Sequence, residues 1–143
     1  MSRVGRWARA VRRLGPRDVV FVARAGVVAT AAEVLLWRAS MPTVARWVTR
    51  RGPVRGPLPS EDRLVRLTDR LLALDVGPLR PNCVLRSLVL LRYLPGDDLC
   101  LRVGVRPQVR PVDGHAWLER DGLPVAEATD PRPIYQETWS WVR

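Results

Sequence analysis

The residues of this chain best suited to chemistry are Cys83 and His115, the latter being the only histidine among 143 residues. A thiol is a strong nucleophile only as a thiolate, and a nearby imidazole can take its proton. Cys83 follows Asn82, a residue type that commonly caps helices, so the thiol is expected at a helix N-terminus. The N–H groups left unpaired there favour an anion. Together the two residues predict a thiol hydrolase site.

A third group is needed to orient the imidazole, and the hairpin that follows His115 decides which residue supplies it. A two-residue turn at Asp121-Gly122 pairs His115 with Ala128. A three-residue turn places the glycine in the left-handed conformation that suits it and pairs His115 with Glu127. Directly paired residues share one face of a sheet, so the second register puts a carboxylate beside the imidazole. We prefer this register for that reason. Glu127 is therefore the predicted third group, with Asp130 as the alternative.

Three more residues are candidates for contact with a substrate. Arg86 and Ser87 lie about one turn into the helix that Cys83 begins, and Trp117 shares a strand face with His115. Each residue type also has an ordinary structural role. Arginine and serine cap and pack helices, and tryptophan fills cores. Both interpretations stay open at this point.

The sequence offers little for other chemistry. One histidine and two separated cysteines give no zinc-ligand spacing, and no glycine-rich phosphate loop is present, so we expect neither a metal nor ATP to bind. Cys100 begins an apolar strand with no histidine or cap nearby and is expected to be a buried thiol. Two cysteines are too few for a secreted disulfide scaffold, which indicates a reducing cytoplasm.

The elements that position these residues are helices first and strands second, an order typical of an α+β domain. We predict helices over residues 1–15, 19–39, 40–51, 60–77 and 83–93, with Asp18, Ser60 and Asn82 as N-caps, and strands over 99–106, 115–120 and 123–127. The tail, 131–143, is left unassigned. A proline-rich loop, 52–59, separates a basic helical region, 1–51, from the predicted core, 60–143. The length fits one domain overall.

The net charge of +10 is concentrated in the first half of the chain. Residues 1–70 hold 15 arginines against 5 acidic residues, whereas residues 71–143 hold 9 of each. No nucleic-acid-binding module is recognisable, so nucleic acid is not expected as a partner. Arg24 and Glu33 within the apolar stretch 19–37 argue against a membrane span. A helix lying on a membrane surface is an alternative for Trp7, Trp37 and Trp47, which we expect to pack in the core instead.

Three segments together resemble the transglutaminase-like leader peptidases of lasso-peptide biosynthesis. They are Cys83-Val84-Leu85-Arg86-Ser87-Leu88, Val103-Gly104-Val105-Arg106-Pro107 and the run from Gly114 to Gly122, and the likeness covers residues 80–135. The resemblance implies a papain-like core, in which a nucleophilic cysteine at a helix N-terminus packs on a small antiparallel sheet. It also implies a Cys-His-Asp triad that cuts a leader from a ribosomal precursor through a thioester. Carried over by position, Cys83 is the nucleophile and His115 the base, and Ala126-Glu127 stands where the family usually has its aspartate.

The same resemblance implies partners. Full-length members carry a small leader-recognition domain ahead of the peptidase, and no strand-rich winged-helix pattern is found here. The chain therefore resembles the split form, with the precursor peptide, a separate recognition protein and an ATP-dependent lasso cyclase as expected partners. The basic first half would face the recognition protein or an acidic leader. Two alternatives remain: a transglutaminase-like module that binds peptide or protein without cutting, and acyl transfer to an amine in place of water.

Overall fold

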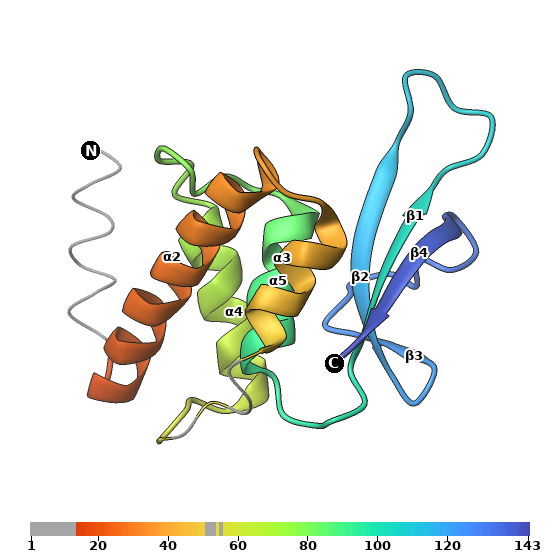
Figure 1. The fold of residues 1–143 in the computed structure, drawn as a ribbon. Coiled ribbons are helices and arrows are strands. Elements are labelled where there is room, and N and C mark those ends of the chain that lie inside the picture. The colour runs from red at the N-terminus through yellow and green to blue at the C-terminus, as the bar shows by residue number, and fades with distance from the viewer. Residues whose placement is uncertain (1–13, 51–53, 55) are drawn as a thin grey trace.

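The computed structural model describes residues 14–50, 54 and 56–143, and in this part of the chain four helices precede four strands, a segregated order typical of an α+β fold (Figure 1). The helices are α2 (Pro16–Leu36), α3 (Met41–Thr49), α4 (Glu61–Leu72) and α5 (Cys83–Tyr93). The strands are β1 (Cys100–Val105), β2 (Gly114–Arg120), β3 (Leu123–Val125) and β4 (Gln136–Val142). They form one antiparallel sheet in the order β3-β2-β1-β4, and the helices gather on one side of it.

Helix α5 is the centre of the hydrophobic core. Its leucines, among them Leu85, Leu88 and Leu91, are completely buried, and it packs against the other three helices and against β1 and β2. A helix surrounded in this way is apolar over most of its surface, which explains why seven of its eleven residues are buried, Leu88 to Leu91 in one run. Ala116 and Leu118 of β2 join the same core from the sheet.

The helical half and the strand half share this core. Phe21 and three alanines of α2 are buried in it, and Val54 and Leu58 of the proline-rich loop pack against it. Small alanines allow α2 to approach α5 closely. Val54 and Leu58 therefore belong to the same packed unit as the described helices before them and the sheet after them.

The first predicted N-cap is wrong. Gly15 occupies the cap position of α2, and Asp18 lies in the first turn, buried, where it accepts hydrogen bonds from Arg63 Nε (2.8 Å) and Nη2 (2.5 Å) of α4. Proline suits the first position of a helix because it has no N–H to lose, so α2 begins earlier than predicted, at Pro16. The ion pair ties α2 to α4, and the hydrogen bond from Arg63 holds the pKa of Asp18 below its usual value.

Other boundaries differ for identifiable reasons. Helix α4 ends at Leu72 because the chain turns through Asp75 and Gly77, both at positive φ. Ser60 precedes α4 as predicted, but its side chain makes no capping bond. Strand β4 was not predicted, although tryptophans at alternate positions, 139 and 141, pack against the core from the edge of the sheet. The predicted helix 1–15 lies mostly outside the described residues.

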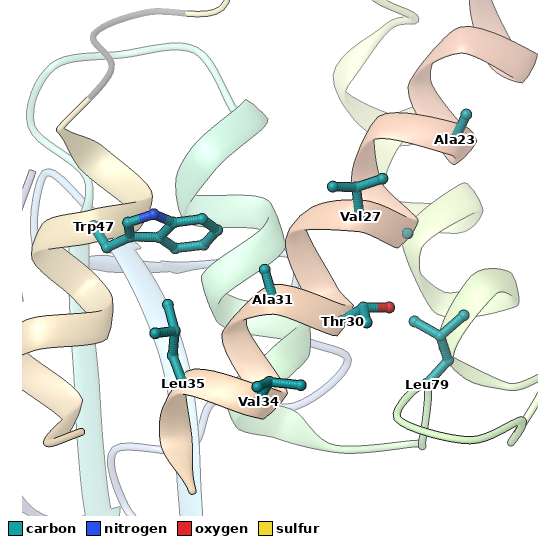
Figure 2. A pocket seen from close by; sticks show the side chains of 9 residues that line it. Ala23, Val27, Thr30, Ala31, Val34, Leu35, Trp47 and Leu79 are labelled. Carbon is teal, nitrogen blue, oxygen red and sulfur yellow. The ribbon is translucent and has the colours of Figure 1, made fainter. Parts of the chain in front are cut away.

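Helix α2 is apolar on its outer side as well. Val27 is 70% exposed there, and a groove of about 760 Å³ runs between α2, Trp47 of α3 and Leu79 (Figure 2). By length and composition alone α2 could cross a membrane, with a mean hydropathy of 2.0 over 18 residues. Trp37 is 68% exposed, so the expectation that it packs in the core is wrong, while Trp47 is half-buried in the groove and Trp7 lies outside the described residues.

Candidate active site

Cys83 is the first residue of α5, and its free thiol is partly exposed. The predicted cap is confirmed, since Asn82 Oδ1 accepts a hydrogen bond from the N–H of Val84 at 2.8 Å. The N–H groups of a first helical turn have no carbonyl partner within the helix. Asn82 satisfies one of them, and the N–H of Cys83 itself points in the same direction. The thiol therefore lies where the helix favours negative charge.

His115 and Glu127 are in direct contact. His115 Nε2 lies 3.1 Å from Glu127 Oε2, and the two side chains are 25% and 12% exposed. A carboxylate can only accept a hydrogen bond, so we infer that Nε2 carries the proton. In the neutral ring the lone pair is then on Nδ1, the nitrogen that faces away from Glu127. This is the form of the ring that a base needs.

The hairpin register preferred in the sequence analysis is wrong. Leu118 pairs with Val125 and Arg120 with Leu123, so the turn has two residues, not three. Asp121 and Gly122 take φ of 53° and 73°, as the two central positions of a type I′ turn require. Aspartate tolerates the left-handed region well enough to share this turn with glycine.

Glu127 nevertheless reaches His115, by another route. Strand β3 ends at Val125, and Ala126 takes a φ of 61°, which turns the chain and directs the next side chain toward His115. Asp130, the alternative third group, is exposed and binds Arg132 at 2.6 Å. The structure thus places Glu127, and not Asp130, beside the imidazole.

Arg86 is occupied by groups of the protein itself. Its Nη1 donates to Glu127 Oε1 (3.2 Å), its Nη2 to the carbonyl of Ala126 (2.6 Å) and its Nε to Asp69 Oδ1 of α4 (2.6 Å). Through Glu127, this arginine connects the first turn of α5 to His115. The predicted contact between Arg86 and a substrate would therefore compete with three existing bonds.

Ser87 and Trp117, the other predicted substrate contacts, are each only 1% exposed. The hydroxyl of Ser87 donates to the carbonyl of Ala116 (3.0 Å), and Trp117 Nε1 donates to Glu119 Oε1 (3.0 Å). Side chains that are buried and paired in this way hold the structure together rather than face a substrate. Of the two roles left open for Ser87 and Trp117, their burial and pairing favour the structural one.

The bond from Ser87 shows which side of α5 faces β2. Residues four apart lie above one another on a helix, so Cys83 shares the side of α5 from which Ser87 reaches Ala116 of β2. Ala116 is the neighbour of His115 along the strand. Hydrogen bonds join Arg86 of the first turn of α5, Glu127 and His115 into one cluster at the start of β2.

Two members of this cluster were missed from the sequence. Tyr135 stacks on His115 with ring centroids 5.1 Å apart, its hydroxyl donates to Asp113 (3.3 Å), and Arg106 covers its ring at 5.6 Å. The second missed member is Asp69 of α4, which accepts a hydrogen bond from Arg86 Nε. Tyr135 comes from the unassigned tail, and Asp69 looks like one more charge on an amphipathic helix, so neither gave a signal in the sequence.

The second cysteine is different from the first. Cys100 is buried as predicted, and burial is the main cause that raises the pKa of its thiol. Within residues 14–50, 54 and 56–143, no three His, Cys, Asp or Glu side chains gather closely enough to hold a metal ion. The described chemistry is therefore that of a partly exposed thiol, an imidazole and a carboxylate.

A cysteine at the start of a buried helix, a histidine on an adjoining antiparallel strand and an acid beside it define a papain-like or transglutaminase-like arrangement. Residues 26–140 match the transglutaminase-like superfamily, so the chain belongs to this family. The match begins inside α2 and extends into β4. Comparisons with curated proteins and with solved structures gave no significant match.

Proposed function

We propose that this protein is a cysteine endopeptidase that removes the leader from a ribosomally made lasso precursor peptide. The observation that carries the proposal is the 3.1 Å contact between His115 and Glu127, linked through Arg86 to the helix that Cys83 begins. A thiol at a helix N-terminus, with an oriented imidazole on the adjoining strand, is suited to attack on a peptide carbonyl. The likeness of residues 80–135 to lasso leader peptidases supplies the substrate class.

In the first half of the reaction, His115 Nδ1 takes the proton of the Cys83 thiol. The sulfur attacks the scissile carbonyl, and the N–H groups at the start of α5 stabilise the oxyanion that forms. His115 then gives the proton to the leaving amine, and the C–N bond breaks. The core peptide departs with a new N-terminal amine, and the leader stays on Cys83 as a thioester.

In the second half, His115 Nδ1 takes a proton from water, and the hydroxide attacks the thioester carbonyl. The C–S bond breaks, the leader leaves as a carboxylic acid, and the proton returns to the sulfur. Glu127 keeps its contact with Nε2 throughout and stabilises the imidazolium that forms in each half. An amine in place of water would give acyl transfer through the same thioester.

We propose three partners for this activity: the precursor, a separate leader-recognition protein and an ATP-dependent cyclase that uses the freed amine. The excess of 10 positive charges in residues 1–70 supports an acidic leader or an acidic face of the recognition protein as the group that binds there. We place the activity in the cytoplasm, where both free thiols, Cys83 and Cys100, stay reduced.

The test is cleavage of a precursor peptide, followed by mass spectrometry, with the recognition protein present. Wild-type protein and the matched control Cys100→Ala are expected to release the leader, and Cys83→Ala to leave the precursor intact. Intact precursor with all three proteins, together with a stable complex, would replace the proposal with the binding module. Cleavage by Cys83→Ala would show that another group acts as the nucleophile.

A further inference from the structure

We propose that Arg86 is a positioning residue: it holds the Glu127 carboxylate against His115, and Asp69 of α4 holds Arg86 in turn. This inference rests on the proposed function, because it says how the acid of the proposed triad is kept in place. It replaces the direct role in substrate binding that the sequence suggested for Arg86.

Glu127 needs such support because the sheet does not supply it. Strand β3 pairs with β2 only from Leu118 to Arg120, so Glu127 lies beyond the last strand pair. A glutamate outside regular structure has three side-chain torsions that are free to move. Arg86 restricts it from both ends, through Oε1 of the carboxylate and through the carbonyl of the preceding residue, Ala126.

The conformation of Ala126 points to the same role. A φ of 61° is unfavourable for any residue with a Cβ, and alanine has no polar side chain to stabilise it locally. Strained residues of this kind persist only where the surrounding structure enforces them. The 2.6 Å bond from Arg86 Nη2 to the Ala126 carbonyl fixes the peptide whose orientation directs Glu127 toward His115.

Asp69 completes the arrangement from a separate helix. It accepts from Arg86 Nε at 2.6 Å and lies 3.5 Å from Nη2, so the guanidinium is held at the edge opposite Glu127. The planar fork of an arginine can serve both carboxylates and a carbonyl at once, which the single ammonium of a lysine cannot. Arg86 thus bridges two carboxylates, one from α4 and one beside His115.

The experiment compares Arg86→Lys, which keeps the charge and loses the fork, with Asp69→Asn and with wild-type protein. Arg132→Lys is the matched control, because Arg132 also binds a carboxylate, that of Asp130, on an exposed loop. Precursor cleavage gives kcat and KM separately. Two further measurements need no substrate: the NMR signal of the Nε2 proton, which a single histidine makes unambiguous, and the rate of Cys83 alkylation by iodoacetamide.

Arg86→Lys is expected to lower kcat on the order of 10- to 100-fold with little change in KM, the size of loss seen when a residue that orients a metal-binding histidine is removed. The Nε2 proton is expected to exchange faster with water, and Cys83 to alkylate more slowly. Asp69→Asn is expected to change all three in the same direction by less, and Arg132→Lys to change none. Asp69 is half-exposed, so this variant reports on positioning even where Arg86→Lys unfolds.

Two results would overturn the inference. An increase in KM with unchanged kcat and proton exchange would return Arg86 to substrate binding. Unchanged behaviour in all three measurements for both Arg86→Lys and Asp69→Asn would mean that Glu127 is held without them. If wild-type protein cleaves no precursor while the proton exchange and the alkylation rate still respond to Arg86→Lys, the positioning role stands and the proposed substrate is wrong.

Discussion

Replacing Glu127 with glutamine tests the orientation of His115 most sharply, because the two side chains have the same shape. Glu127 accepts from two donors, Arg86 Nη1 at 3.2 Å and His115 Nε2 at 3.1 Å. Glutamine offers only one oxygen, and its NH2 group can only donate. Arginine cannot accept a hydrogen bond, so the oxygen must face Arg86 and the NH2 group must face His115.

The size of the effect follows from this arrangement. Loss of one hydrogen bond to a charged group costs about 1.5–3 kcal/mol, which corresponds to a rate loss of about 10- to 150-fold. The NH2 group also forces the proton of the neutral ring from Nε2 to Nδ1, the nitrogen that must take the thiol proton. Such a change of tautomer lowers kcat by about 10⁴-fold in a serine protease triad. We therefore expect Glu127→Gln to lower kcat/KM by more than about 10-fold, the smallest effect of the lost hydrogen bond. The loss should not exceed about 10⁴-fold, the effect of a complete change of tautomer.

The assay is the initial rate of precursor cleavage, with the 15N chemical shifts of the single imidazole as an independent measure of its tautomer. Asp130→Asn is the control, because Asp130 was the alternative acid and binds Arg132 instead. Full activity of Glu127→Gln, or an equal loss in Asp130→Asn, would refute the role assigned to Glu127. An unchanged tautomer in Glu127→Gln would refute the argument for its mechanism.

Three other predictions concern stability and thiol reactivity. Ser87→Ala removes a buried hydrogen bond and should lower the free energy of unfolding in urea by about 1 kcal/mol, without a change in KM; a raised KM at unchanged stability would restore its role in substrate binding. Because the hydrogen bond from Arg63 keeps the pKa of Asp18 below its ordinary 3.8, the stability from this pair is complete above that pH and is lost as the pH falls through the lower, folded value. Asp18→Asn should therefore be less stable than wild type at neutral pH, with the difference narrowing in acid melts, and a constant difference would contradict the pairing. Burial raises the pKa of the Cys100 thiol, so peptide mapping after iodoacetamide at neutral pH should find Cys100 labelled far more slowly than Cys83, and equal labelling would count against the site.

Local patterns predicted the parts of this fold whose causes lie close in sequence. Asn82 before an apolar run gave the cap, the position of Cys83 and the length of α5, because capping and periodicity are properties of adjacent residues. The α+β order followed from helical periodicity early in the chain and alternation later. Positions set by distant residues were missed: Asp18 looked like a cap because its partner, Arg63, is 45 residues away.

The candidate site shows the same division. The single histidine and a cysteine after a capping asparagine marked His115 and Cys83, but the contact with Glu127 depends on where β3 ends and on the left-handed Ala126. Neither is visible in a pattern of hydrophobic alternation. Glu127 was therefore chosen correctly as the neighbour of His115, but from the wrong strand register.

The measurement that tests the central claim most directly is detection of the leader as a thioester on Cys83. Wild-type protein, recognition protein and precursor are mixed, quenched in acid within the turnover time and examined by intact-protein mass spectrometry and peptide mapping. The account predicts an adduct with the mass of the leader on Cys83, removed by hydroxylamine, and absent from Cys83→Ala and greatly reduced in His115→Ala. Bound but intact precursor, with no adduct at any quench time, would contradict it.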